Sequence, residues 1–215
     1  PNLQRENIMD RRQALIAASA AAFVSALPRF GMAQDASAAP EIVDFALGDP
    51  NAPVELIEYA SFTCPHCATF HLQVLPQLKR DYIETGKVRL VYREVYFDRP
   101  GLWAAMVARC AGEMRYFGVA DIVYRTQREW TQGDAATIAG NLRRIGLSAG
   151  LTDAELDACM QNAETAQAMI DNYEANRVEY PIEGTPALVI DGTLYGNMAY
   201  EDIATRIEDA LARNQ

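Results

Sequence analysis

Residues 54–67 read VELIEYASFTCPHC, and two kinds of secondary structure meet within this stretch. The first half, residues 54–60, is apolar enough to form a buried β-strand. From Pro65 onward, apolar side chains recur every three or four residues, which is typical of an amphipathic helix. The sequence therefore places Cys64 and Cys67 at the junction where a strand passes into a helix.

The rest of the chain separates into strand-like and helix-like segments. Residues 88–97 alternate between two faces, which predicts a second strand. Residues 102–180 contain no convincing strand and predict a run of helices. Residues 186–190 then predict a third strand, and 193–195 predict its hairpin partner across a tight turn. A final amphipathic helix is expected over residues 200–211.

The N-terminal residues have the order of a secretory signal peptide. Arg11 and Arg12 precede an apolar, alanine-rich run over residues 14–27, and small residues follow at 31–33. The apolar run is too short to span a bilayer as a typical helix. We therefore expect residues 1–33 to be an N-terminal extension and signal peptide, exported to the periplasm by the Sec or the twin-arginine route. A buried amphipathic helix is the alternative.

The composition narrows the class of protein and indicates how the cysteines are used. The formal net charge is -10, and an acidic chain is a poor candidate for binding nucleic acid, because phosphate contacts depend on Lys and Arg. The chain has four cysteines, and disulfides persist outside the cytoplasm, so pairing is expected. Four cysteines allow three pairings, of which spacing favours Cys64 with Cys67 and Cys110 with Cys159.

The Cys64-Pro65-His66-Cys67 segment suits thiol–disulfide exchange. At a helix N-terminus, unpaired N–H groups and the macrodipole favour a thiolate at Cys64. Pro65 fits the first helical position, where its missing N–H costs nothing, and protonated His66 adds positive charge. Stabilising the reduced form makes the disulfide a strong oxidant. We expect Cys64 to be the exposed attacking sulfur and Cys67 the more buried resolving one.

Three other interpretations of this cysteine pair remain open. In the first, the pair is half of a zinc site; in the second, it is an inert structural bridge; in the third, it is a dithiol that captures Cu(I) for delivery without enzymatic activity. Tetrahedral zinc needs four ligands, and no second such pair exists in the sequence, so we predict neither a metal site nor a cofactor. His71, one helical turn after Cys67, is expected on the helix surface.

Residues 58–67 resemble the active-site strand and turn of the DsbA-like disulfide oxidoreductases of the thioredoxin superfamily, and residues 184–186 (GTP) resemble the cis-proline loop of that superfamily. The resemblance implies an α/β, thioredoxin-like fold with a helical subdomain inserted in the sheet domain. Residues 34–98 and 181–215 would form the thioredoxin-like domain, and residues 99–180 the inserted helical subdomain.

The resemblance also implies roles for single residues. Pro186 would be cis, and Thr185 would lend backbone groups to an extended substrate; a trans proline starting an edge strand is the alternative. Glu58 would be a buried acid that relays a proton to or from the resolving cysteine, rather than an ordinary carboxylate facing solvent. Cys110 and Cys159 would form a second, structural disulfide; two buried thiols are the alternative.

The implied activity is that of a periplasmic dithiol oxidase, which passes its disulfide to unfolded exported proteins. The resemblance further implies a monomer that is reoxidised by a quinone-linked membrane partner. Thr185 departs from the Val of the enteric DsbA pattern and looks more like the residue of isomerase relatives and other DsbA branches. A disulfide reductase or isomerase on the same scaffold therefore stays open as a second hypothesis.

Overall fold

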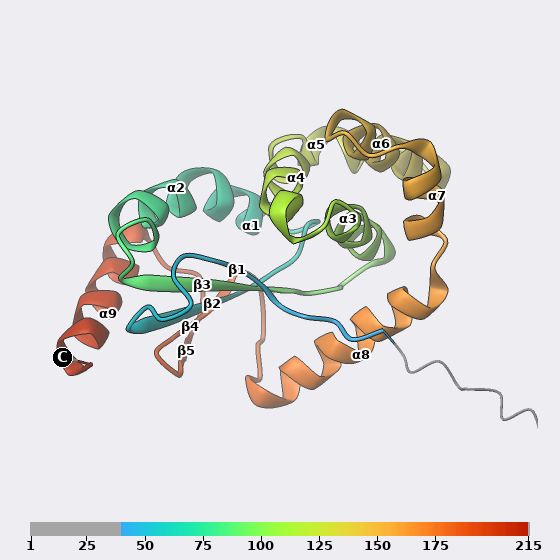
Figure 1. The fold of residues 1–215 in the computed structure, drawn as a ribbon. Coiled ribbons are helices and arrows are strands. Elements are labelled where there is room, and N and C mark those ends of the chain that lie inside the picture. Colours follow the sequence, from blue (N-terminus) through green and yellow to red (C-terminus); the bar gives the residue numbers. More distant parts are fainter. Residues whose placement is uncertain (1–39, 215) are drawn as a thin grey trace, which may run out of the picture. The chain divides into compact units, whose positions relative to one another are not determined.

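The computed structural model describes residues 40–214, so the expected signal peptide over 1–33 lies outside the described residues. A five-stranded mixed sheet with strand order β1-β3-β2-β4-β5 lies at the centre of this part of the chain (Figure 1). The strands are β1 (Phe45–Leu47), β2 (Val54–Ala60), β3 (Val88–Glu94), β4 (Ala187–Ile190) and β5 (Thr193–Tyr195). β2 and β3 run parallel, as a strand–helix–strand unit requires, and the other neighbours are antiparallel.

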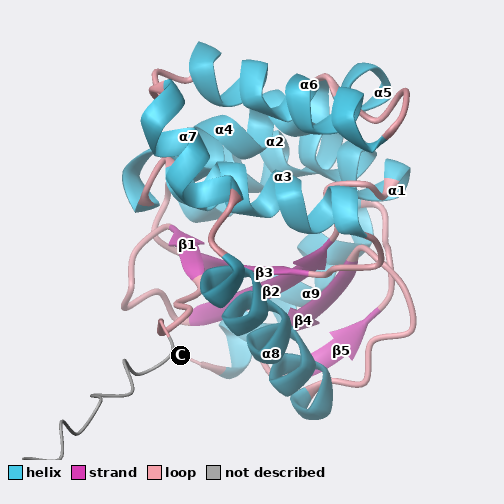
Figure 2. Cartoon of the chain, turned by 90° about the vertical axis from the view of Figure 1, so that its right-hand side faces the viewer, coloured by secondary structure: helices cyan, strands magenta, loops and turns pink. Residues whose placement is uncertain are grey.

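Helices flank the sheet on both faces (Figures 1 and 2). The helix that follows β2 consists of α1 (Pro65–Thr69), a π-helical turn (Phe70–Val74), α2 (Leu75–Leu78) and a second π-helical turn (Lys79–Ile83). Between β3 and β4 lie α3 (Arg99–Cys110), α4 (Glu113–Arg125), α5 (Gln127–Trp130), α6 (Ala135–Ser148), α7 (Asp153–Met160) and α8 (Ala163–Glu179). The last helix is α9 (Tyr200–Arg213). The expected thioredoxin-like architecture with helices inserted between two strands is confirmed.

The alternation of side chains along the strands explains the layers. Leu56, Leu90 and Leu188 point to the face covered by α2, its flanking π-helical turns and α9, whereas Ile57 and Val91 point to the opposite face, which packs against Tyr173 of α8. The inserted helices therefore divide, with α8 beneath the sheet and α3 to α7 on the other side (Figure 1). They also share a core with the sheet.

The inserted helices and the sheet meet in that shared core. Phe62 and Tyr92, from the sheet side, pack in one hydrophobic cluster with Val107, Tyr116 and Leu142 of the insertion. The insertion is therefore packed directly against the strand-to-helix junction rather than tethered to it by its ends.

Two strand boundaries differ from the sequence predictions, and one strand is absent from them. β3 ends at Glu94 rather than at 97, because Asp98 turns the chain and caps α3, its carboxylate accepting from the Gly101 N–H at 2.7 Å. β4 begins at Ala187, since Pro186 has no N–H for the sheet ladder. The sequence pattern does not predict β1, because three residues are too few to display an alternation.

One helical boundary also differs. The periodicity predicts one helix over 117–130, but α4 ends at Arg125 and α5 begins at Gln127. Pro76 lies in the short α2 segment between the two π-helical turns. Proline crowds the carbonyl four residues earlier, and a wider π-helical turn before it relieves that crowding.

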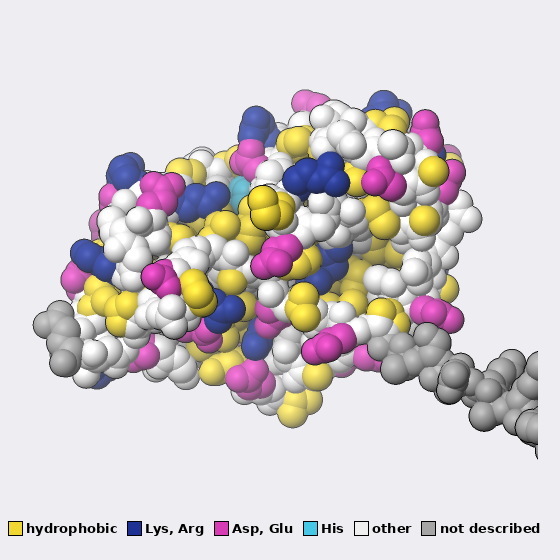
Figure 3. Space-filling view, in the orientation of Figure 1, with side chains coloured by type: hydrophobic (Ala, Val, Ile, Leu, Met, Phe, Trp, Pro, Cys, Tyr) yellow, Lys and Arg dark blue, Asp and Glu magenta, His cyan; other side chains and the backbone are white. Residues whose placement is uncertain are grey.

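The described surface carries charges of both signs. Figure 3 shows Lys and Arg side chains interspersed with Asp and Glu over the face drawn, without a continuous basic stripe. No helix within residues 40–214 combines the length and the apolar character needed to cross a bilayer.

Cys110 at the end of α3 and Cys159 in α7 are joined by a disulfide that spans 49 residues of chain. Replacing both by alanine should lower the free energy of unfolding of the oxidised protein by about 4 kcal/mol, because a loop of this length gains that much chain entropy when its cross-link is lost. The melting temperature should fall by about 10 °C, measured by circular dichroism. A variant that melts with the wild type would contradict a structural role for this bridge. The matched control, Cys64→Ala with Cys67→Ala, should retain the cross-link in unreduced mass spectra.

Candidate active site

Cys64 occupies the N-cap position of α1. Its backbone is extended, with φ -78° and ψ 121°, and Pro65 takes the first helical position. In its thiol form, Cys64 Sγ donates to the Thr185 carbonyl oxygen at 3.3 Å, and the side chain is partly exposed. Cys67, one turn into the helix, is completely buried. The two sulfurs, which are not joined by a disulfide here, therefore lie in unlike surroundings.

The surroundings separate the acidities of the two thiols. The pKa of Cys64 falls from 9.0 to about 5, chiefly through the hydrogen-bonding influence of the Cys67 thiol, with smaller contributions from the neighbouring Thr185 side chain and from the backbone N–H groups of Cys67 and His66. Partial burial of Cys64 opposes this shift. Burial raises the pKa of Cys67 far above its usual range, and the neighbouring Cys64 and Glu58 add to that effect. At neutral pH the site therefore holds one thiolate and one thiol.

Glu58 is a fully buried acid in β2. Its side chain has no exposed surface, and neither carboxyl oxygen has a hydrogen-bond partner within residues 40–214. Burial raises the pKa of Glu58 to about 8, so it is mostly protonated at neutral pH. Glu58 is thus not an ordinary solvent-facing carboxylate. Its protonation state is coupled to Cys67, since an ionised Glu58 makes the Cys67 thiol harder to deprotonate.

The loop before β4 closes the site from the other side. The Thr185–Pro186 peptide bond is cis, and it directs the Thr185 carbonyl at Cys64. The Thr185 hydroxyl is buried and unpaired within the described chain, beside both sulfurs. A cavity of about 460 Å³ lies along residues 181–187 and 194–197. Thr185 therefore both lines this cavity and contacts Cys64, although neither cysteine lines the cavity itself.

The two histidines near the motif lie in opposite environments. His66 is exposed at the surface. The prediction that His71 is a surface residue is wrong: it is 4% exposed, and its ring stacks on Tyr124 of α4 with 4.7 Å between centroids. α4 of the insertion covers the side of the helix that sequence analysis assigned to solvent. Burial lowers the pKa of His71 to about 4, so its ring is neutral at neutral pH, with Nε2 3.7 Å from an Asp121 carboxyl oxygen.

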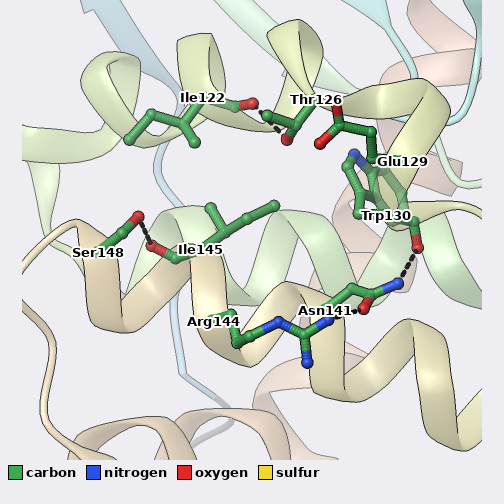
Figure 4. Close-up of a pocket in the computed structure, with 8 residues that line it drawn as sticks. All are labelled: Ile122, Thr126, Glu129, Trp130, Asn141, Arg144, Ile145 and Ser148. Carbon is green, nitrogen blue, oxygen red and sulfur yellow. Dashed lines mark hydrogen bonds between the residues drawn. The ribbon is translucent and has the colours of Figure 1, made fainter.

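Among residues 40–214 there is no group of three or more His, Cys, Asp and Glu side chains placed to hold a metal ion. A separate cavity of about 330 Å³ lies between α4, α5 and α6, lined by Ile122, Trp130 and Arg144 among others (Figure 4). Neither Cys64 nor Cys67 lines it.

A family model described as thioredoxin matches residues 41–209, which is most of the chain. This chain belongs to the thioredoxin family. A Rickettsia felis protein that bears the name of a protein-disulfide oxidoreductase is 32% identical over 171 residues, covering 78% of this chain and 60% of that protein. The chain spans about 60% of the length of several such curated relatives.

The solved structures that are similar to this chain include DsbA proteins. Wolbachia pipientis alpha-DsbA1 superposes with a TM-score of 0.73 at 27% identity, covering 81% of this chain and 94% of that one. A protein-disulfide isomerase from Novosphingobium aromaticivorans superposes with a TM-score of 0.70 at 26% identity, covering 78% and 97%. The resemblance to the DsbA-like oxidoreductases is confirmed.

One residue of the site in this thioredoxin-family chain has no signal in the sequence. Gln127 of α5 donates its side-chain amide to the carbonyl oxygens of Phe62, at 2.8 Å, and of Cys64, at 3.0 Å. It is buried. A polar residue in a one-turn helix of the insertion looks like any surface position, and only tertiary packing brings it to the cysteines.

The reduced protein should titrate near pH 5 in the ultraviolet absorbance of the thiolate. The Cys64→Ala variant should lose this transition. The Cys67→Ala variant should keep it but at higher pH, because the largest source of stabilisation of the thiolate, the hydrogen bond from Cys67, has been removed. A wild-type midpoint near 9 would refute the assignment.

Replacing Glu58 by glutamine should change how stability depends on pH. Burial raises the pKa of Glu58 from 4.5 to about 8, so the folded protein retains a proton that the unfolded chain gives up, and wild-type stability falls as pH rises between these values. The Glu58→Gln variant lacks this loss. Its free energy of unfolding, relative to that of the wild type, should therefore rise by about 4 kcal/mol from pH 4.5 to pH 8, measured by denaturant unfolding. An equal difference between variant and wild type at both pH values would count against a buried, protonated Glu58.

Proposed function

We propose that this protein is a periplasmic thiol:disulfide oxidoreductase that introduces disulfide bonds into exported proteins through Cys64 and Cys67. The observation that carries this proposal is the pairing of a partly exposed, acidic Cys64 with a buried, weakly acidic Cys67 at the end of a helix. A stable thiolate favours the reduced form, and a protein that is stable when reduced oxidises others.

The exchange takes two steps that balance in electrons and protons. A substrate thiolate attacks Sγ of Cys64 in the Cys64–Cys67 disulfide, and Cys67 leaves and takes up a proton. A second substrate thiolate then attacks the substrate sulfur of the mixed disulfide and releases Cys64 as a thiolate. The substrate loses two electrons, and the protein dithiol gains them.

Each residue around the sulfurs has a proposed part in these steps. Glu58, which is protonated at neutral pH, supplies a proton to Cys67 when it leaves and then takes up another from water, and the same relay runs in reverse on reoxidation. Thr185 and cis-Pro186 offer backbone groups to the extended substrate next to Cys64. His66 adds positive charge beside the thiolate when it is protonated, and Pro65 starts the helix whose N–H groups face the sulfur.

The cellular setting follows from the same proposal. A signal peptide over residues 1–33 would carry the chain to the periplasm, where unfolded exported proteins are its substrates. A quinone-linked membrane protein would reoxidise the dithiol. We further propose that it acts as a monomer, in which residues 99–180 form an inserted helical subdomain and residues 34–98 and 181–215 the thioredoxin-like domain.

The oxidised protein should convert a reduced, unfolded secretory protein to its disulfide form, with one substrate disulfide formed per molecule. The Cys64→Ser variant should abolish this transfer, because no sulfur remains for the substrate to attack. The Cys110→Ala, Cys159→Ala variant serves as the matched control and should still transfer one disulfide. If the Cys64→Ser variant oxidised the substrate at the wild-type rate, the proposal would be refuted.

A disulfide isomerase or reductase is the second candidate function. It is favoured by Thr185 before the cis proline and by the similarity to a structure titled as a protein-disulfide isomerase. Reactivation of a scrambled-disulfide protein by the reduced chain separates the two candidates. Reshuffling that outpaces net oxidation, together with a low redox potential, would favour this second function.

A further inference from the structure

The active-site turn contains two carbonyl groups whose hydrogen bonds do not come from the sheet and α1 alone. Residues 61–63 connect β2 to α1 and lie outside both elements, so the buried Phe62 carbonyl has no place in a strand ladder. The Cys64 carbonyl accepts the first hydrogen bond of α1, from the Ala68 N–H at 3.2 Å. Gln127 is the donor that reaches both carbonyls, through one side-chain nitrogen.

Gln127 is itself held firmly within the insertion. The single turn of α5 ends in Trp130, which is buried and donates its indole N–H to the Val123 carbonyl at 2.8 Å. Asn141 of α6 donates to the Trp130 carbonyl at 3.2 Å, as Figure 4 shows. The amide that touches the active-site turn therefore belongs to a segment fixed by α4 and α6.

The Cys64 carbonyl lies in the same peptide unit that joins Cys64 to Pro65. Holding its oxygen sets the rotation of that peptide plane, and with it the extended N-cap backbone of Cys64. This backbone directs Sγ toward the N–H groups of His66 and Cys67 at the start of α1. Donors that are already in place when charge develops cost no reorganisation, so they stabilise the charge more strongly than mobile ones do.

We infer that Gln127 is a positioning residue, whose side-chain amide fixes the Cys64–Pro65 peptide so that the inserted helices control how well the helix N-terminus stabilises the Cys64 sulfur. Gln127 does not touch the reacting atoms. It acts through the backbone of the turn, and it makes the insertion part of the redox site rather than a cover over it. The inference deepens the proposed function, in which Cys64 is the attacked sulfur.

The test replaces Gln127 by methionine, which is similar in length but has no donor. In the reduced Gln127→Met variant, the ultraviolet titration of Cys64 should move up by about one pH unit, which is a tenfold loss of thiolate stabilisation relative to the thiol. The control is Gln132→Met, the same change five residues later at an exposed position whose side chain bonds only to Thr131 within the described chain. It should leave the Cys64 titration unchanged.

A Cys64 titration in folded Gln127→Met that coincides with the wild type would overturn the inference. If circular dichroism shows that this variant does not fold, Gln127→Asn replaces it, since asparagine keeps a buried amide but is too short to reach both carbonyls. An upward shift in Gln127→Asn then supports the inference, and an unchanged titration overturns it. The titration uses no substrate, so its failure leaves the proposed oxidase activity standing, whereas failure of the oxidation assay leaves the inference standing.

Discussion

The site depends on one electrostatic contrast, between a sulfur at the mouth of a helix and a sulfur one turn inside it. Cys64 lies where backbone N–H groups have no partners in the helix and therefore stabilise an anion. Cys67 is surrounded by apolar side chains and stays protonated, and its thiol donates to the Cys64 thiolate. Because the helix starts at Pro65, a shift of one residue in this junction would move Cys64 out of the N-cap position.

Three parts of the fold maintain this contrast from different directions. β2 leads into the turn and carries Glu58, a buried acid without a hydrogen-bond partner among residues 40–214. The cis-proline loop approaches Cys64 from the start of the neighbouring strand β4, with the Thr185 carbonyl against its sulfur. The inserted helices bury the side of the helix that bears His71 and reach the turn through Gln127. A local motif thus acquires its chemistry from segments that lie far along the chain.

Local patterns in the sequence predict the elements that carry the motif, because strand and helix periodicity extend over many residues there. The approach of Thr185 to Cys64 joins residues 121 positions apart, and only the resemblance to a known family pointed to it. β1 is too short to show a period. The burial of His71 and the reach of Gln127 come from the packing of α4 and α5 against the turn, which no local pattern encodes. The signal peptide predicted over residues 1–33 lies outside the described part of the chain.

The most direct test of the central claim is the equilibrium between the Cys64–Cys67 pair and glutathione, measured as a function of pH. If the reduced protein holds Cys64 as a thiolate with a pKa near 5, then reduction of the Cys64–Cys67 disulfide by two glutathione molecules releases one proton. The equilibrium constant for reduction should then rise about tenfold per pH unit from just above pH 5 until the glutathione thiol itself begins to ionise, near pH 8. An equilibrium constant that does not vary over this range would mean that reduced Cys64 is an ordinary thiol, and it would contradict the account.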